Sequence, residues 1–280
     1  MKVLLVSRAP EFSPGKVVLD SLLLQAVARQ LGQDGHSAIF CRETDLSDQV
    51  LQMTDIVVSM ARCEDSLICL ERGGKCVINS PSAVRLALSR KAMLQVLTDA
   101  GILVPQWCAY NPLADKRVLS TSFLQTFMPC WIKGMHSKGV SQGDVLYVKD
   151  VSEASNRLLS MLKEGYSDIV ITRHLSGFLV KAYVVGGQLI HWMLPQLCGY
   201  TKFGDEVHND APQEMWVDES LLRNLSVQIA SLTHLDVFGF DAIVSSPAKM
   251  CVIDVNDAPS FSSCRHEASK AICKLINKKK

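Results

Sequence analysis

Two aspartates near the end of the sequence lie in apolar segments that are spaced like the strands of a β-hairpin. The segments cover 236–244 and 250–256, and a turn centred on 247–248 joins them. In a regular ladder with that turn, Asp241 lies directly opposite Asp254, with Cβ atoms about 5 Å apart on one face of the hairpin. The pattern therefore predicts two carboxylates side by side in an otherwise apolar hairpin.

Two further residues extend this polar face. Asn256 follows Asp254 by two residues and points the same way, and its cross-strand partner is Gly239, which leaves room for a ligand. Opposed carboxylates repel each other, so their repulsion must be offset. Mg²⁺ would do this, because it is usually held by one or two carboxylates together with substrate phosphates. The alternative is an ordinary polar stripe whose aspartates point into water.

The first part of the chain alternates strand and helix signals. Segments with strand character are 2–7, 37–41, 55–59 and 75–79. Segments with helix character are 17–31, 46–52 and 64–72. This alternation predicts a parallel sheet with helices on its faces, the α/β class. No G-x-G-x-x-G follows the first strand, so a nicotinamide or flavin dinucleotide site is not expected.

The rest of the chain follows a helix expected at 82–100 and is richer in strands. The expected strands are 129–134, 144–149, 168–172, 178–185 and 188–194, and those of the last hairpin. The expected helices are 152–163, 218–233 and 265–276. Gly186 and Gly187 form a two-glycine hairpin signal. This part therefore belongs to the α+β class, with antiparallel sheets.

Composition excludes several classes of partner. The net charge is +1, from 29 Lys+Arg against 28 Asp+Glu, which does not support nucleic acid or an anionic membrane as the main partner. No apolar run has the length of a signal peptide or membrane helix, so a cytoplasmic protein is expected. The ten cysteines include no CxxC pair, and Cys76, Cys130 and Cys251 lie in apolar segments. Buried, reduced thiols are therefore expected.

The hairpin strands GFDAIV and VIDVNDAPSF resemble the C-terminal signature of the ATP-grasp superfamily. In that superfamily, an acidic residue on one strand and acidic-x-Asn on the next bind the magnesium ions that bridge ATP phosphates. The resemblance therefore assigns Mg²⁺ to Asp241, Asp254 and Asn256. It assigns nucleotide contacts to Lys91, in NSPSAVRLALSRK, and to Lys133, in CWIKG.

Lys133 also stands out without the resemblance. An ammonium group in an apolar strand needs an anion nearby, and a nucleotide phosphate would supply one. The alternative is an edge-strand lysine whose ammonium group reaches water.

The order of the expected elements predicts three structural units. Residues 1–87 would form an α/β domain with a parallel sheet, 88–167 a small lid subdomain, and 168–280 an antiparallel-sheet subdomain with the metal site. Nucleotide is expected to bind between the last two units.

Several positions differ from the usual ATP-grasp pattern. Where family members commonly have Gln-Glu-aromatic at the ribose, this chain has Thr172, Arg173 and His174, which we assign to the nucleotide site by position. The run LVKAYVVGG resembles the inositol-phosphate kinase branch, in which this segment faces the phosphorylated substrate. Lys181 in this run is thus the candidate catalytic residue, and the alternative is a sheet-face lysine paired with a carboxylate. The family's substrate-anchoring arginine is missing, and Lys202 is a candidate replacement.

The function expected from this resemblance is that of a Mg-ATP-dependent ligase. Such an enzyme activates a carboxylate of a small molecule or peptide as an acyl phosphate, which an amine or thiol then attacks. Positioning and charge neutralisation supply most of the catalysis in phosphoryl transfer. One alternative is a kinase that phosphorylates a hydroxyl of a polyol phosphate, which the cations Arg173, His174, Lys181 and Lys202 would favour. Another is a nucleotide-binding protein that has lost catalysis.

Overall fold

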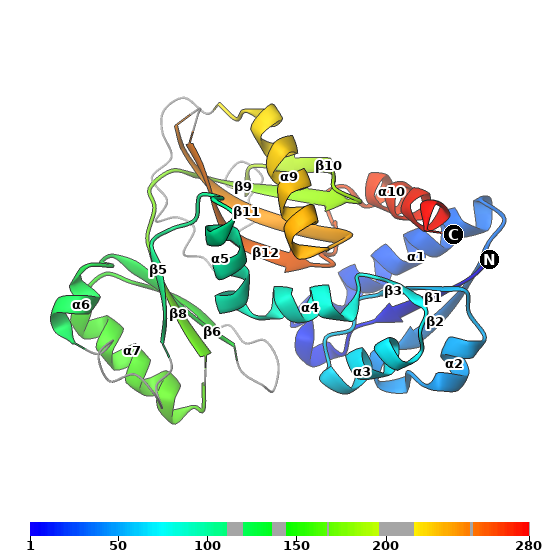
Figure 1. Ribbon diagram of the computed structural model, residues 1–280, viewed down its shortest axis with the longest axis horizontal. Helices are drawn as coiled ribbons and strands as arrows, with labels where there is room; N and C mark the ends of the chain where they lie inside the picture. The colour runs from blue at the N-terminus through cyan, green and yellow to red at the C-terminus, as the bar shows by residue number, and fades with distance from the viewer. Residues whose placement is uncertain (111–119, 136–143, 167, 196–215, 247–248, 280) are drawn as a thin grey trace.

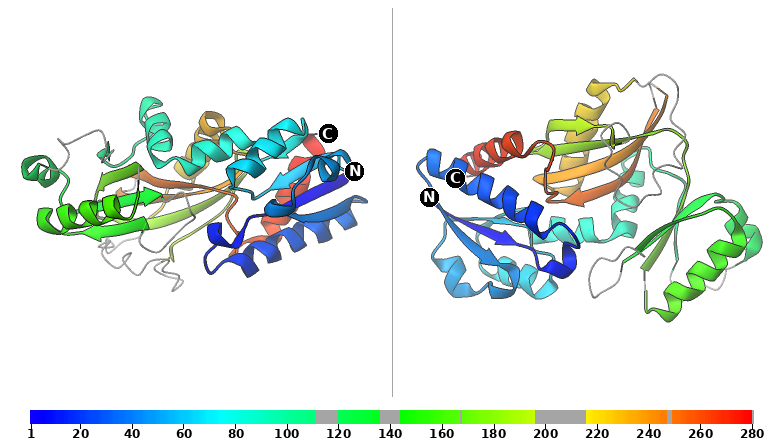
Figure 2. Two further views of the ribbon diagram at one scale, coloured as in Figure 1. Left: turned by 90° about the horizontal axis from the view of Figure 1, so that it is seen from below. Right: turned by 180° about the vertical axis from the view of Figure 1, so that it is seen from behind.

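The computed structural model describes residues 1–110, 120–135, 144–166, 168–195, 216–246 and 249–279, and these residues form three four-stranded sheets (Figure 1). The sheets lie in a row, with helices between and around them (Figures 1 and 2).

The first sheet is parallel, as the alternation of strands and helices predicted, with strand order β2-β1-β3-β4. Its strands are β1 (Lys2–Ser7), β2 (Ser37–Arg42), β3 (Ile56–Ser59) and β4 (Cys76–Ile78). Helix α1 packs on one face together with α10, and α2 and α3 pack on the other. These helices are α1 (Val17–Gln33), α2 (Asp48–Gln52), α3 (Glu64–Arg72) and α10 (Arg265–Lys278). Two short 3₁₀ turns cover Pro10–Phe12 and Glu43–Asp45.

The second sheet is antiparallel, with strand order β5-β8-β6-β7. Its strands are β5 (Trp107–Tyr110), β6 (Cys130–Met135), β7 (Val145–Val148) and β8 (Asp168–Arg173). Helices α6 (Thr121–Gln125) and α7 (Val151–Lys163) bury their apolar sides against it.

The third sheet is also antiparallel, with strand order β10-β9-β11-β12. Its strands are β9 (Phe178–Val185), β10 (Gln188–Met193), β11 (Val237–Ser246) and β12 (Lys249–Asp257). Three helices form the core on one of its faces (Figure 1). They are α4 (Pro81–Leu88), α5 (Arg90–Asp99) and α9 (Glu219–Thr233).

Two segments belong to different sheets from those expected. The segment 168–173 was placed in the C-terminal unit, but as β8 it lies between β5 and β6 in the second sheet. The segment 88–102 was placed in the lid, but Met93, Leu97 and Ile102 are buried in the core of the third sheet. Burial of these apolar side chains, which the order of elements alone does not reveal, decides where each segment packs.

The helix expected at 82–100 is in fact two helices that meet at Ser89. This residue has extended-like backbone angles (φ −92°, ψ 100°), and its hydroxyl accepts a hydrogen bond from the backbone N–H of Ala92. Serine is a favoured N-cap residue, so a helix that begins at Arg90 is stabilised at this point. The break places Arg90 at the first position of α5.

Asn79 connects the first sheet to the third. Its side chain is buried after β4, donates to the carbonyl of Val237, and accepts from the N–H groups of Asp236 and Val237 at 2.7–2.8 Å. One amide thus satisfies three backbone groups where β11 begins, which fixes this strand relative to the first sheet.

Cysteine burial agrees only in part with the sequence prediction. Cys130 and Cys251 are buried, and burial raises the pKa of both thiols to about 12, so they stay protonated. Cys76 is exposed instead, because β4 is the edge strand of its sheet. The cysteines that the structure describes form no disulfide. Among the described helices, none has both the length and the apolar composition needed to cross a membrane.

Candidate active site

The last hairpin has the predicted register at its functional end. Asp241 pairs with Asp254, and Gly239 pairs with Asn256. The turn residues 247–248 lie outside the described residues. Between the turn and the aspartates the ladder is shifted by one residue, because Ala242 pairs with Val252 rather than Ile253. A regular ladder was expected there, and this expectation was wrong.

The shift is a β-bulge at Ile253, and it changes what faces the site. Val252 and Val255 both pack in the core of the third sheet, while Asp254 between them faces a cavity. A bulged residue has no cross-strand partner in the ladder, so its backbone groups are available to other donors. The carbonyl oxygen of Ile253 accepts a hydrogen bond from Lys133 Nζ at 3.0 Å.

The two aspartates are each contacted by a cationic side chain. Lys181 is the cross-strand neighbour of Asp241 on β9, and its Nζ lies 2.8 Å from Asp241 Oδ2. Arg90 Nη1 lies 3.4 Å from Asp254 Oδ1, and Asn256 Nδ2 donates to Asp254 Oδ2 at 3.2 Å. A bound cation was expected to offset the repulsion between the two carboxylates, but these protein side chains supply part of that offset.

Lys133 is a buried cation that points at this acidic pair from the second sheet. It is 8% exposed, and burial lowers its pKa, while the negative charge of Asp254 opposes this shift and the positive charge of Arg90 adds to it. The edge-strand alternative, with the ammonium group in water, is wrong: β6 lies between β8 and β7, inside the sheet.

These side chains line one cavity between the second and third sheets. Seven of the residues proposed from the sequence line it: Lys133, Thr172, Arg173, Lys181, Asp241, Asp254 and Asn256. Two others do not. Lys91 is exposed on α5 outside the cavity lining, and His174 Nδ1 instead accepts a hydrogen bond from Trp131 Nε1 at 3.1 Å. Lys202 lies outside the described residues.

Several lining residues were not found from the sequence. Arg62 and Arg90 contribute charge, and an apolar group forms the other part of the wall. The apolar members include Met93, Leu94, Leu97, Pro105, Trp131, Leu175, Leu179 and Ile243. A serine N-cap signal at Ser89 would have placed Arg90 at a helix start. Nothing in the sequence pattern marks the apolar residues, because core residues have the same composition.

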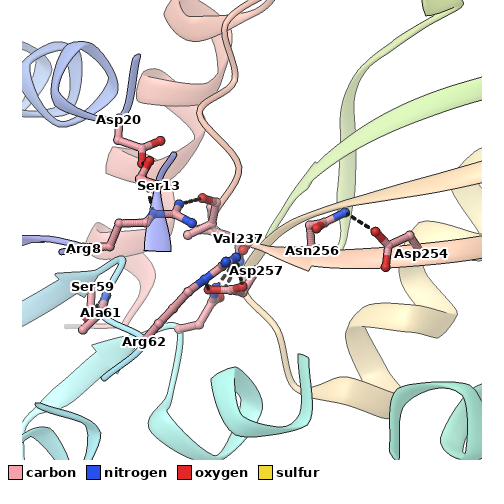
Figure 3. A network of polar contacts seen from close by, with 12 residues as sticks. Arg8, Ser13, Asp20, Ser59, Ala61, Arg62, Val237, Asp254, Asn256 and Asp257 are labelled. Atoms are coloured by element: carbon pink, nitrogen blue, oxygen red, sulfur yellow. Dashed lines mark hydrogen bonds and ion pairs between the residues drawn. The ribbon is translucent and has the colours of Figure 1, made fainter. Parts of the chain in front are cut away.

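Arg62 anchors the end of the hairpin to the first sheet (Figure 3). It follows β3, and its guanidinium contacts both carboxylate oxygens of Asp257. The Arg62 side chain is 12% exposed and that of Asp257 is 2% exposed. The backbone N–H groups of Arg62 and Cys63 both donate to Glu43 Oε2 at 2.8 Å, which fixes the loop that carries the arginine.

A second arginine contacts the residue after Asp257. Arg8 follows β1, donates to the carbonyl oxygen of Ala258, and forms an ion pair with Asp20 at 3.0 Å (Figure 3). Burial lowers the pKa of Arg8 to about 10, and the nearby charge of Arg62 adds to this. Ala258 has φ 35°, a left-handed conformation that turns the chain out of β12 toward both arginines.

The donor set at the hairpin suits a hard divalent cation. Asp241 and Asp254 offer carboxylate oxygens and Asn256 an amide oxygen, which are the ligand types that Mg²⁺ prefers. No group of three or more His, Cys, Asp or Glu residues with metal-binding geometry occurs in the part of the chain that the structure describes. A site of two carboxylates and one amide therefore needs oxygens from a bound substrate to complete its coordination.

No protein-family model and no curated protein matches this sequence. Solved structures match it along its whole length. A RimK domain ATP-grasp protein from Sphaerobacter thermophilus has a TM-score of 0.70 at 16% identity, covering 99% of this chain and 100% of that one. D-alanine–D-alanine ligase from Bacillus anthracis, complexed with ATP, has a TM-score of 0.70 at 13% identity, with 100% of both chains covered.

A third structure, the ATP-grasp ligase PsnB complexed with its minimal precursor, has a TM-score of 0.65 at 16% identity, covering 99% of each chain. At these identities the comparison establishes the architecture, and the chain has the ATP-grasp fold. The predicted resemblance to ATP-grasp structures is thus confirmed, while the local resemblance to inositol-phosphate kinases stays a prediction.

The Arg62–Asp257 pair gives a test of how the hairpin is anchored. Arg62→Ala leaves the Asp257 carboxylate buried without its cation, so it should lower the free energy of unfolding by about 3 kcal/mol. Arg72→Ala is the matched control, because its pair with Asp48 is exposed (66% and 53%) and should contribute little to the free energy of unfolding. Urea denaturation measures both, and equal effects would contradict a role for burial.

Proposed function

We propose that this protein is a Mg-ATP-dependent ligase that activates a carboxylate as an acyl phosphate for attack by an amine or thiol. The observation that carries the proposal is a single cavity in which a buried lysine, Lys133, faces Asp254 and Asn256. A cation that is buried among apolar strands and directed at hard oxygen ligands suits a phosphate chain that carries a metal ion.

The residues that line the cavity would suit two parts of ATP, the phosphates and the purine ring. Lys133 and Arg90 place positive charge beside the acidic hairpin. The apolar residues of α5, together with Trp131, Leu179 and Ile243, line the remainder. Binding sites of this kind combine an apolar wall with a few polar groups that fix orientation, and a purine ring is the part of ATP that would occupy the wall.

The hairpin would hold the metal through its two carboxylates and the amide of Asn256. When bound, a divalent cation neutralises phosphate charge during transfer. Gly239 lies opposite Asn256, and a Cβ there would come 3.1 Å from the carbonyl oxygen of Ala182 and 3.4 Å from Pro259 Cγ. The room for a ligand that the sequence predicts at Gly239 is therefore filled by the protein itself.

The charges near the acceptor favour a ligase over a kinase acting on a polyol phosphate. A polyphosphorylated acceptor needs several converging cations, and the candidates were Arg173, His174, Lys181 and Lys202. Lys181 is paired with Asp241, and His174 is packed against Trp131 and Tyr147. Among the described candidates, only Arg173 lines the cavity without an ion pair to Asp241 or a packing contact with the aromatic rings. A single cation suits an acceptor with a single carboxylate.

Lys133→Met tests the phosphate assignment. The methionine retains an apolar stem in a buried site, while the charge-assisted hydrogen bond to phosphate, about 1.5–3 kcal/mol, is lost. ATP affinity, measured by calorimetry with Mg²⁺, should fall about ten- to a hundred-fold.

Two further lysine variants sharpen this comparison. Lys149→Met is the control, because Lys149 is exposed outside the cavity and its loss should leave ATP affinity unchanged. Lys91→Met tests the nucleotide contact that the family resemblance assigns to Lys91. Because Lys91 is exposed outside the cavity, we expect this variant to lower ATP affinity less than Lys133→Met does. If Lys133→Met binds ATP as tightly as the unmodified protein, Lys133 does not contact phosphate.

Hydroxylamine trapping distinguishes the two enzyme classes. An acyl phosphate reacts with hydroxylamine to form a hydroxamate, whereas direct transfer to a hydroxyl gives no such product. We expect hydroxamate only when ATP and a carboxylate acceptor are both present, across a panel of amino acids and short peptides. A stable phosphorylated polyol, with no hydroxamate from any carboxylate, would instead establish a kinase.

A further inference from the structure

Arg90 contacts one of the two aspartates in a way that leaves its own hydrogen-bonding capacity unused. Its Nη1 is 3.4 Å from Asp254 Oδ1, longer than the 2.7–2.9 Å of a strong charge-assisted hydrogen bond. Its Nε is buried and makes no hydrogen bond within the part of the chain that the structure describes. A buried donor without a partner is costly, so this guanidinium is suited to an additional anion.

The ion pair between Lys181 and Asp241 is shorter than that between Arg90 and Asp254. Lys181 Nζ lies 2.8 Å from Asp241, and the two residues are direct neighbours in the ladder between β9 and β11. Arg90 instead approaches Asp254 from the first position of α5, outside the sheet. Asp254 also accepts from Asn256 on its other oxygen. The ion pair of Arg90 is therefore the longer of the two and is not imposed by strand pairing.

A divalent cation at Asp254 would meet this guanidinium. Two like charges a few Å apart repel each other strongly at the effective dielectric of a protein surface. Lys133, which already contacts the carbonyl of Ile253, adds positive charge at the same place. Metal alone thus has to displace Arg90 without compensation, whereas metal with nucleotide offers the displaced guanidinium a phosphate.

We propose that Arg90 occupies Asp254 in the resting protein, and that the metal–nucleotide complex transfers its guanidinium from Asp254 to a nucleotide phosphate. The proposal rests on the function proposed above and adds an order to it. Divalent metal binds this site with nucleotide and not before it. The binding of each raises the affinity for the other by the same factor, as thermodynamic linkage requires.

The test measures Mn²⁺ binding to the purified full chain by the electron paramagnetic resonance signal of free Mn²⁺, with and without ATP. Arg90→Gln should bind Mn²⁺ alone about tenfold or more tightly than the unmodified protein, because the competing charge is gone. The same variant should bind Mn–ATP about tenfold or more weakly, because the phosphate loses its guanidinium. A residue with a purely structural role would not change the two affinities in opposite directions.

Two variants serve as controls. Arg90→Lys keeps the charge, so its binding of Mn²⁺ alone should stay close to that of the unmodified protein even if Arg90→Gln folds poorly. Arg85→Ala removes a guanidinium from the adjacent helix α4, where it pairs with Glu64 and Glu71, and should leave both affinities unchanged.

The possible failures are distinguishable. If Arg90→Gln and Arg90→Lys both bind Mn²⁺ alone like the unmodified protein, while Mn–ATP binding persists, the transfer of Arg90 is wrong and the proposed function stands. If the unmodified protein binds Mn²⁺ tightly without ATP, the transfer of Arg90 is likewise wrong and the proposed function stands. If the unmodified protein binds no Mn–ATP, both the transfer and the proposed function are wrong.

Discussion

The opposition of Asp241 and Asp254 across the last hairpin determines what must surround it. Two carboxylates in this position destabilise the hairpin unless positive charge lies nearby. The chain provides Lys181 from the next strand, Arg90 from a helix start and Lys133 from the second sheet. Cations from three parts of the chain thus converge on one acidic pair, and the cavity forms where they meet.

The hairpin can serve as a fixed platform because its end is tied to the first sheet. Arg62 and Arg8 follow β3 and β1, so they project from the carboxyl ends of neighbouring parallel strands, where α/β proteins usually place functional groups. They contact Asp257 and Ala258, directly after Asn256. Asn79 fixes the start of β11 in the same way. The first sheet therefore positions both strands of the hairpin.

The sequence predicts every strand of the described residues except β5, most of the helices and the pairing of Asp241 with Asp254, because side-chain periodicity and turn position determine these locally. It missed the bulge at Ile253, since no residue there marks an extra position, and thus the contact made by Lys133. It placed the nucleotide contact at Lys91, whereas Arg90 faces the cavity because Ser89 restarts the helix. The bulge and the Lys133 contact depend on tertiary packing, and the position of Arg90 depends on the N-cap at Ser89, which interrupts an otherwise continuous helical pattern.

The central claim is that the cavity between the second and third sheets binds a metal–nucleotide complex at the hairpin. A crystal structure of the chain with Mn²⁺ and a non-hydrolysable ATP analogue tests this most directly, because manganese is located by its anomalous signal. The account predicts a manganese peak beside the side-chain oxygens of Asp254 and Asn256, with phosphates within reach of Lys133. Nucleotide bound elsewhere, or in this cavity with no metal at the hairpin, would contradict it.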